Sequence, residues 1–256
     1  MKQNKYTGSV LIIITFLFAF YGQRFLGRYF PIEFTTYIGK ALYTYAWWLV
    51  PSSIVIGLLY GFKNLHKEFG LYKGLFTGLA FAAITVAPML ISSAITGELN
   101  RDMNPGELIH KTVLAGLMEE LFFRAFLFGI LFRKLGWGFI PASILGAVIF
   151  GIGHLYQASS FAEAGGIFLV TAMGAVWFSW LFIEWNKNLW VPVFLHILMN
   201  MSWILFDVSN NALGGFSTNL FRITTIALTI IITIIYKRKK GSLAINRKCL
   251  IINSEA

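Results

Sequence analysis

The chain has 256 residues, of which 57% are hydrophobic and only 12% are charged, and its formal net charge is +10. Soluble globular proteins carry about 25% charged residues, so this chain has too few charges to cover a water-facing surface. The composition excludes an ordinary soluble domain and indicates an integral membrane protein.

Eight apolar stretches follow one another along the chain, and most approach the length of about 20 residues that a helix needs to cross a bilayer. Lipid offers the backbone no hydrogen-bond partners, which favours helices over open strands. We predict an all-α integral membrane protein, a single bundle of about eight transmembrane helices that forms one polytopic domain over residues 1–256. The expected spans are residues 8–22, 42–62, 74–96, 112–132, 139–157, 165–184, 191–208 and 219–236.

The Lys and Arg residues outside these spans are distributed unevenly, and cytoplasmic connections of membrane proteins are enriched in both. This rule predicts a multi-pass protein of the cell membrane with cytoplasmic N- and C-termini. The basic cytoplasmic tail, residues 237–256, is expected to meet anionic lipid. No nucleic-acid partner is predicted, because no soluble fold carries the charge. The segments assigned to the cytoplasmic side are the N-terminus, residues 63–73, Arg133 and Lys134, Lys187 and the tail.

The fourth expected span contains three charges within the run Met118-Glu-Glu-Leu-Phe-Phe-Arg-Ala-Phe126. A charge at the centre of a membrane helix costs roughly 2.5–3.5 kcal/mol, so unpaired charges would destabilise this span. Glu120 and Arg124 are four residues apart, share a helix face and are expected to form an ion pair. A purely structural ion pair would account for these two residues. It would not account for Glu119, which lies about 100° around the helix from Glu120 and needs another partner.

Spans five and seven supply polar partners, at His154 and at His196 and Asn200. The turn between spans four and five is centred near Gly136, and Glu119 precedes it by 17 residues while His154 follows it by 18. At equal rise per residue the two side chains reach the same depth, which predicts that they hold one water molecule between them. His196 and Asn200 are four residues apart and share one helix face.

The depth of His196 conflicts with this arrangement. Counted along the seventh expected span, it lies nearer the cytoplasmic face than Glu119 does. The conflict has three possible origins: the span is tilted, it begins deeper in the membrane, or the inside and outside assignment is reversed.

Together these motifs resemble the signature of the CPBP family, the CAAX proteases and bacteriocin-processing (Abi) proteins that include the Ras-converting endoprotease. The motifs are E-E-x-x-x-R from Glu119 to Arg124, F-x-x-x-H from Phe150 to His154 and H-x-x-x-N from His196 to Asn200. The resemblance covers about residues 112–204, the expected catalytic core. It implies hydrolysis of a peptide bond within the membrane.

The resemblance also implies roles for the motif residues. Glu119 is expected to act as the general base that activates a water molecule, and His154 is expected to hold that water. His196 and Asn200 are expected to donate hydrogen bonds to the oxyanion of the tetrahedral intermediate. The supporting residues, which fix the helix and set the local charge, are Glu120 and Arg124.

The family is often described as metal-dependent, and its members also include glutamate-type enzymes. Glu119, His154 and His196 offer the nitrogen and oxygen donors that zinc prefers, with Glu120 as the base if zinc is bound. The sequence contains no H-E-x-x-H zinc motif. We predict no cofactor, with zinc as the alternative.

The expected substrate is a membrane-embedded or lipid-anchored peptide, and the lipid bilayer is the expected surrounding partner. One alternative is a non-catalytic bacteriocin self-immunity protein of the same family, whose function would survive loss of Glu119. A proton-coupled transporter is a second alternative, since buried acid–histidine pairs also relay protons. Transporters of that kind are built from two related halves with broken helices, and no such symmetry is visible in the sequence.

Overall fold

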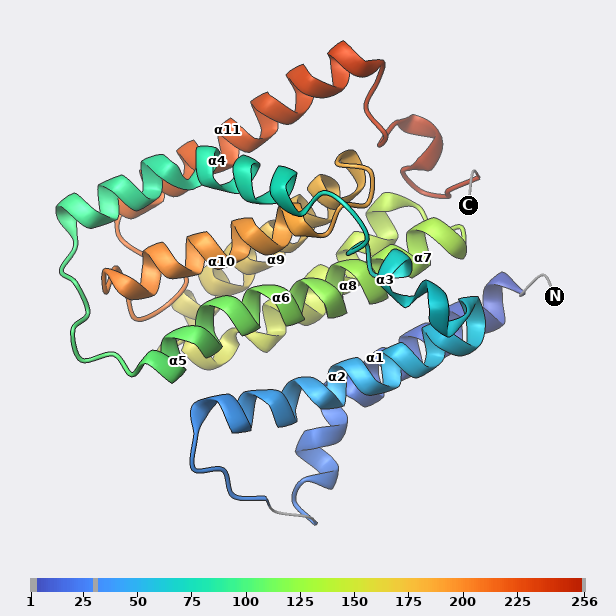
Figure 1. Ribbon diagram of the computed structural model, residues 1–256, viewed down its shortest axis with the longest axis horizontal. Helices are drawn as coiled ribbons and strands as arrows, with labels where there is room; N and C mark the ends of the chain where they lie inside the picture. The colour runs from blue at the N-terminus through green and yellow to red at the C-terminus, as the bar shows by residue number, and fades with distance from the viewer. Residues whose placement is uncertain (1–3, 30–31, 255–256) are drawn as a thin grey trace.

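The computed structural model describes residues 4–29 and 32–254, and regular secondary structure in these ranges is helical apart from one isolated bridge between Trp137 and Ile252. The long helices run side by side in a bundle (Figure 1). They are α1 (Lys5–Leu26), α2 (Tyr37–Tyr60), α4 (Leu75–Thr96), α8 (Phe139–Gly153), α9 (Phe161–Glu184), α10 (Trp190–Leu205) and α11 (Phe216–Lys240). A short helix, α3 (Leu65–Glu68), lies between α2 and α4.

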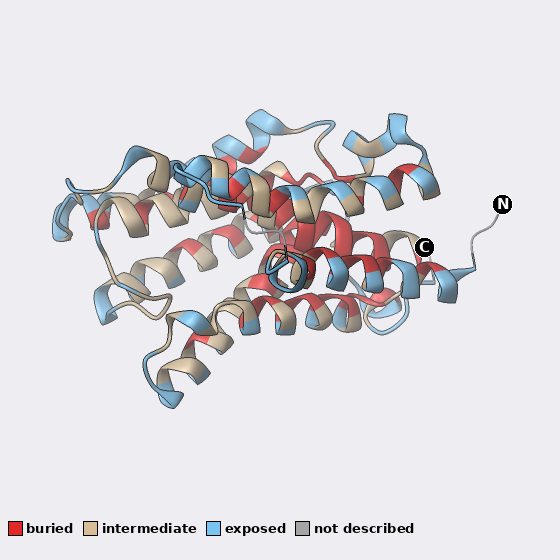
Figure 2. Cartoon of the chain, turned by 90° about the horizontal axis from the view of Figure 1, so that it is seen from below, coloured by how far each residue is buried: buried red, intermediate tan, exposed pale blue. Residues whose placement is uncertain are grey.

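The fourth span is helical from Pro105 to Lys134 but is not a uniform α-helix. It consists of α5 (Pro105–Ile109), the π-helix η2 (His110–Leu114), α6 (Ala115–Glu119), the π-helix η3 (Glu120–Phe128) and α7 (Gly129–Lys134). Asn104 begins it, because its side-chain oxygen accepts hydrogen bonds from the first backbone N–H groups. Every residue of η3 is buried, and the buried residues gather at the centre of the molecule (Figure 2).

The eight predicted spans all correspond to helical segments, and the predicted all-α membrane fold is confirmed. Six of the helices (α1, α2, α4, α9, α11 and α8 with its following turn) are long and apolar enough to cross a membrane. α10 is a shorter apolar helix of 16 residues that ends at Leu205 rather than at residue 208. The chain is therefore a multi-pass membrane protein.

The helices pack around the fourth span. α4 lies against α10 and α11, α8 against α9, and α1 against α2. Aromatic rings join the first two helices to η3: the ring of Phe122 stacks at 4.3 Å on Phe16 of α1 and at 4.9 Å on Trp48 of α2. Burial of such rings is a main source of stability in a core, so α1 and α2 hold η3 in place.

The segments that the charge pattern assigned to the cytoplasm meet at one end of the bundle, where both termini lie (Figure 1). Trp137 Nε1 donates to Ser9 Oγ at 3.0 Å, and Lys134 Nζ lies 2.9 Å from Glu68 Oε1. Asn188 Nδ2 donates to the Gly74 carbonyl at 3.0 Å. The Lys and Arg distribution requires these segments to lie at the same end of the bundle, as they do. That this end faces the cytoplasm stays a prediction.

The C-terminal segment is more ordered than a free basic tail. Residues 241–254 fold back over the turn between α7 and α8. The buried carboxylate of Glu184 accepts the backbone N–H groups of Ala244 and Ile245, each at 2.9 Å. Lys237 is also buried and lies 3.6 Å from the same carboxylate, so it is held by protein rather than presented to lipid. The sequence did not predict this attachment, because Glu184 and the tail are far apart along the chain.

Candidate active site

The predicted ion pair in the fourth span is present at the centre of the bundle. Arg124 Nε lies 3.1 Å from Glu120 Oε2, and their side chains are 2% and 0% exposed. The two atoms are in ion-pair contact without an aligned hydrogen bond. The guanidinium also lies 4.6 Å from the ring centre of Phe150 and 5.5 Å from that of Phe178. Two aromatic faces and one carboxylate therefore compensate for the burial of this cation.

The second oxygen of Glu120 orients His196. Nδ1 of His196 lies 2.8 Å from Glu120 Oε1, and the carboxylate can only accept, so Nδ1 carries the proton. In the neutral imidazole Nε2 is then an acceptor. Nε2 lies 3.9 Å from Oε2 of Glu119, which is buried and has no hydrogen-bond partner among the described residues. Two groups able to accept a proton thus face each other across a short gap.

The depth of His196 is explained by the position of α10. Gly116 of α6 packs so closely on α10 that a methyl group there would lie 2.6 Å from Ile197 Cγ1. The two helices run antiparallel. Trp190 precedes Ile197 by seven residues, so it lies at the same level as the residue about seven positions after Gly116. α10 therefore begins well inside the bundle, short of the end of the fourth span at Lys134. This register fits the deeper start among the three origins considered, and the inside and outside assignment stays a prediction.

Asn200 lies one turn further along α10 and bonds to the backbone of the fourth span. Its Nδ2 donates to the carbonyl of Lys111 at 3.0 Å. The π-helix η2 makes this bond possible, because the N–H of Ala115 turns to the carbonyls of His110 and Thr112 and not to that of Lys111. One N–H of the Asn200 amide is occupied in this way, and the other remains for a ligand.

His154 lies at the end of α8 and does not contact Glu119 directly. Its Nδ1 lies 2.8 Å from the Phe150 carbonyl, and its ring packs at 4.4 Å on the ring of Phe150. Within the described part of the chain no hydrogen bond or ion pair joins it to a carboxylate. That Glu119 and His154 hold one water molecule between them stays a prediction. The ring of Phe150 contacts both His154 and Arg124, and Arg124 is the ion-pair partner of Glu120.

Two residues near Glu119 were not predicted from the sequence. Tyr45 of α2 and His110 of the fourth span both interact electrostatically with the carboxylate of Glu119, and their ring centres lie 6.1 Å apart. Tyr45 is only 6% exposed. In the sequence it resembles the other aromatic residues of an apolar run, so no local signal marks it as part of the site.

The donors of a possible metal site are only partly assembled. Among residues 4–29 and 32–254, no group of three or more His, Cys, Asp or Glu side chains is placed to hold a metal ion. Glu119 and His196 face each other, and the bond of His154 Nδ1 to the Phe150 carbonyl leaves Nε2 as the ligand atom of that imidazole. The zinc alternative with Glu119, His154 and His196 stays a prediction.

The segment that holds these residues matches known proteins. Residues 104–202, which include all six predicted site residues, match the family described as "Type II CAAX prenyl endopeptidase Rce1-like". The chain is also 35% identical over 96 residues to "Putative membrane peptidase YdiL" of Bacillus subtilis (strain 168). This match covers 38% of the chain and 35% of the relative, so the chain spans about a third of the length of the relative that it matches.

Proposed function

Since its segment 104–202 matches the Rce1-like family of CAAX proteases, we propose that this protein is an intramembrane endopeptidase. It would hydrolyse a peptide bond of a membrane-embedded or lipid-anchored peptide or protein. The observation that carries the proposal is the 3.9 Å gap between Glu119 Oε2 and His196 Nε2, inside a buried polar cluster. Buried ionisable groups within membrane helices are usually functional.

Glu119 is the proposed general base. Its Oε2 has no hydrogen-bond partner among the described residues, so it can accept a proton from a water molecule that also contacts His196. The water oxygen forms a bond to the carbonyl carbon of the substrate, and the carbonyl oxygen becomes an oxyanion. The proton held by Glu119 then passes to the amide nitrogen as the C–N bond breaks. The products are a carboxyl group and a free amine.

Glu120 and Arg124 act as positioning residues in this proposal. Glu120 holds Nδ1–H of His196 and so directs Nε2 toward Glu119. Arg124 balances the charge of Glu120 and ties it to the aromatic rings of Phe150 and Phe178. Neither residue needs to touch the substrate.

The oxyanion requires a donor, and Asn200 is the proposed one. Its amide retains one N–H beyond the bond to the Lys111 carbonyl. His196 can donate from Nε2 only when it is protonated, so its share in stabilising the oxyanion depends on its protonation state. The role of His154 in holding the water rests on the family motif, because its contact with the cluster runs through Phe150.

The direct test is cleavage of candidate membrane peptides by the purified protein in detergent. Glu119→Gln should abolish cleavage, because an amide cannot take the proton. Glu98→Gln is the matched control, since Glu98 is an exposed acid outside the site. A self-immunity protein that only binds its target would protect cells equally well with and without Glu119→Gln, and that result would contradict the proposal.

A further inference from the structure

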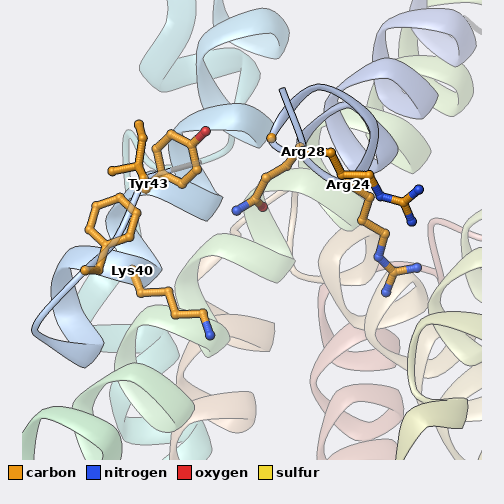
Figure 3. Close-up of a pocket in the computed structure, with 8 residues that line it drawn as sticks. Arg24, Arg28, Lys40 and Tyr43 are labelled. Atoms are coloured by element: carbon orange, nitrogen blue, oxygen red, sulfur yellow. The ribbon is translucent and has the colours of Figure 1, made fainter. Parts of the chain in front are cut away.

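A cavity of about 360 Å³ lies between the end of α1 and the start of α2. Three cationic side chains line it: Arg24 in the last turn of α1, Arg28 in the turn that follows α1, and Lys40 in the first turn of α2 (Figure 3). Gln23 and Tyr43 add polar groups from the same two helices. None of these residues belongs to the cluster around Glu119.

The three cations have no acidic partner in the part of the chain that the structure describes. Within residues 4–29 and 32–254, no ion pair joins Arg24, Arg28 or Lys40 to a carboxylate. Glu33 is the one acid in the sequence that connects α1 to α2, and it forms no ion pair with them. Arg24 and Arg28 line the wall of the same cavity, and like charges so placed repel. An anion bound between these side chains would relieve that repulsion.

The rest of the wall indicates what kind of anion fits. Ile32 and Phe34 give the cavity an apolar side beside the cations. The cavity lies where two helices long enough to cross a membrane end, and Phe18 and Phe25 of α1 are exposed nearby. Lipid phosphates lie at this level of a bilayer, next to the acyl chains. A free inorganic anion would gain nothing from the apolar side of the cavity.

We propose that this cavity binds the headgroup of an anionic phospholipid. The phosphate contacts Arg24, Arg28 and Lys40, and the start of the acyl chains lies against Ile32 and Phe34. Arginine and lysine are the usual phosphate-binding residues, and each basic residue near a membrane surface contributes to anionic lipid binding. The bound lipid would join α1 to α2 and so support the two helices that contact η3 through Phe16 and Trp48.

The experiment is a lipid titration of the delipidated full chain, followed by native mass spectrometry. Phosphatidylglycerol should occupy one saturable site per chain. The variant Arg24→Gln/Arg28→Gln/Lys40→Gln should bind it about a hundredfold more weakly. Since all three residues are exposed, the variant should fold normally. The control Arg238→Gln/Lys239→Gln/Lys240→Gln removes the same charge at the other end of the bundle and should leave the saturable site unchanged.

Two further ligands identify the source of the phosphate. Diacylglycerol with the same chains should not occupy the site, and inorganic phosphate should not displace the lipid at equal concentration. Equal affinity of the cavity variant and the natural chain for phosphatidylglycerol would overturn the proposal. Binding of diacylglycerol at equal strength, or displacement by inorganic phosphate, would overturn it as well.

If the triple variant fails to fold, Lys40→Gln alone should weaken binding about fivefold, and unchanged affinity would refute the site. None of these measurements depends on peptide cleavage.

Discussion

The carboxylate of Glu120 lies 2.8 Å from Nδ1 of His196 and joins the fourth span to α10 at the centre of the bundle. This bond fixes the tautomer of the imidazole, because a carboxylate accepts but does not donate when ionised. Nε2 is thereby directed toward Glu119 at 3.9 Å. In the proposed mechanism the two adjacent acids therefore have different tasks: Glu120 orients the histidine, and Glu119 accepts a proton.

The first prediction tests this positioning. Glu120→Gln should lower kcat for peptide cleavage by on the order of 10²- to 10⁴-fold, because the amide group no longer selects the Nδ1–H tautomer. KM should change little, since Glu120 does not touch the substrate. Steady-state kinetics of the purified variants, with Glu98→Gln as control, provide the measurement. An unchanged kcat would show that orientation of His196 does not depend on the Glu120 carboxylate.

The second prediction concerns the buried charge. Arg124→Ala should lower the yield of folded protein as well as activity, because it leaves Glu120 buried without its cation. The double variant Glu120→Leu/Arg124→Leu should recover part of the yield, since both charges are removed together, but should stay inactive. Yield is measured by gel filtration in detergent. Normal yield and activity of Arg124→Ala would mean that the pair is dispensable.

The third prediction concerns the close approach of α6 and α10. A methyl group at Gly116 would lie 2.6 Å from Ile197 Cγ1 and 3.0 Å from the Ile197 backbone nitrogen, so one helix must move. Gly116→Ala should therefore destabilise the protein by about 1–3 kcal/mol. Gly174→Ala is the control, because open space surrounds Gly174 in α9. Thermal unfolding in detergent compares the two, and equal stability would contradict this packing.

Local sequence patterns were sufficient to predict the spans and the ion pair. Hydropathy identifies an apolar helix wherever it packs, and the four-residue spacing of Glu120 and Arg124 fixes their common face. The close approach of Glu119 and His196 was not predicted. It depends on where α10 begins, and that start is set by packing between α6 and α10 at Gly116.

Other features depend on contacts between distant segments or on backbone geometry. The nine residues of η3 follow the hydrogen-bond pattern of a π-helix, and their side chains are those of an ordinary apolar span. Tyr45 reaches the site because α2 packs on η3 through Trp48. No short sequence motif predicts this packing. Glu184 binds a backbone segment about 60 residues further along the chain. Such features require the folded structure.

The fourth prediction concerns topology. The end of the bundle that carries both termini should face the cytoplasm, because it collects most of the Lys and Arg residues outside the spans. A reporter fused after the last residue should be active only in the cytoplasm, and one inserted in residues 97–104 should be active only outside. The reverse pattern would invert the topology and also move the proposed lipid site to the inner leaflet.

The last prediction distinguishes the two hydrolytic mechanisms. If the Glu119 carboxylate activates the water without a metal, chelators should leave cleavage intact, and the purified protein should contain no stoichiometric zinc. Asn200→Ala should slow the chemical step by on the order of 100- to 1,000-fold, as expected for loss of one oxyanion donor. Substrate affinity should be nearly unchanged, because that donor acts mainly in the transition state.

The zinc mechanism gives the opposite set of results. One zinc ion per chain, with cleavage lost to chelator and restored by metal, would contradict the metal-free mechanism and make Glu119, His154 and His196 the expected ligands. His154 would bind through Nε2, since its Nδ1 is bonded to the Phe150 carbonyl. His154→Ala therefore separates the two cases by a second measurement. It should reduce zinc content sharply if His154 is a ligand, whereas in the metal-free mechanism it should slow cleavage without any change in metal content.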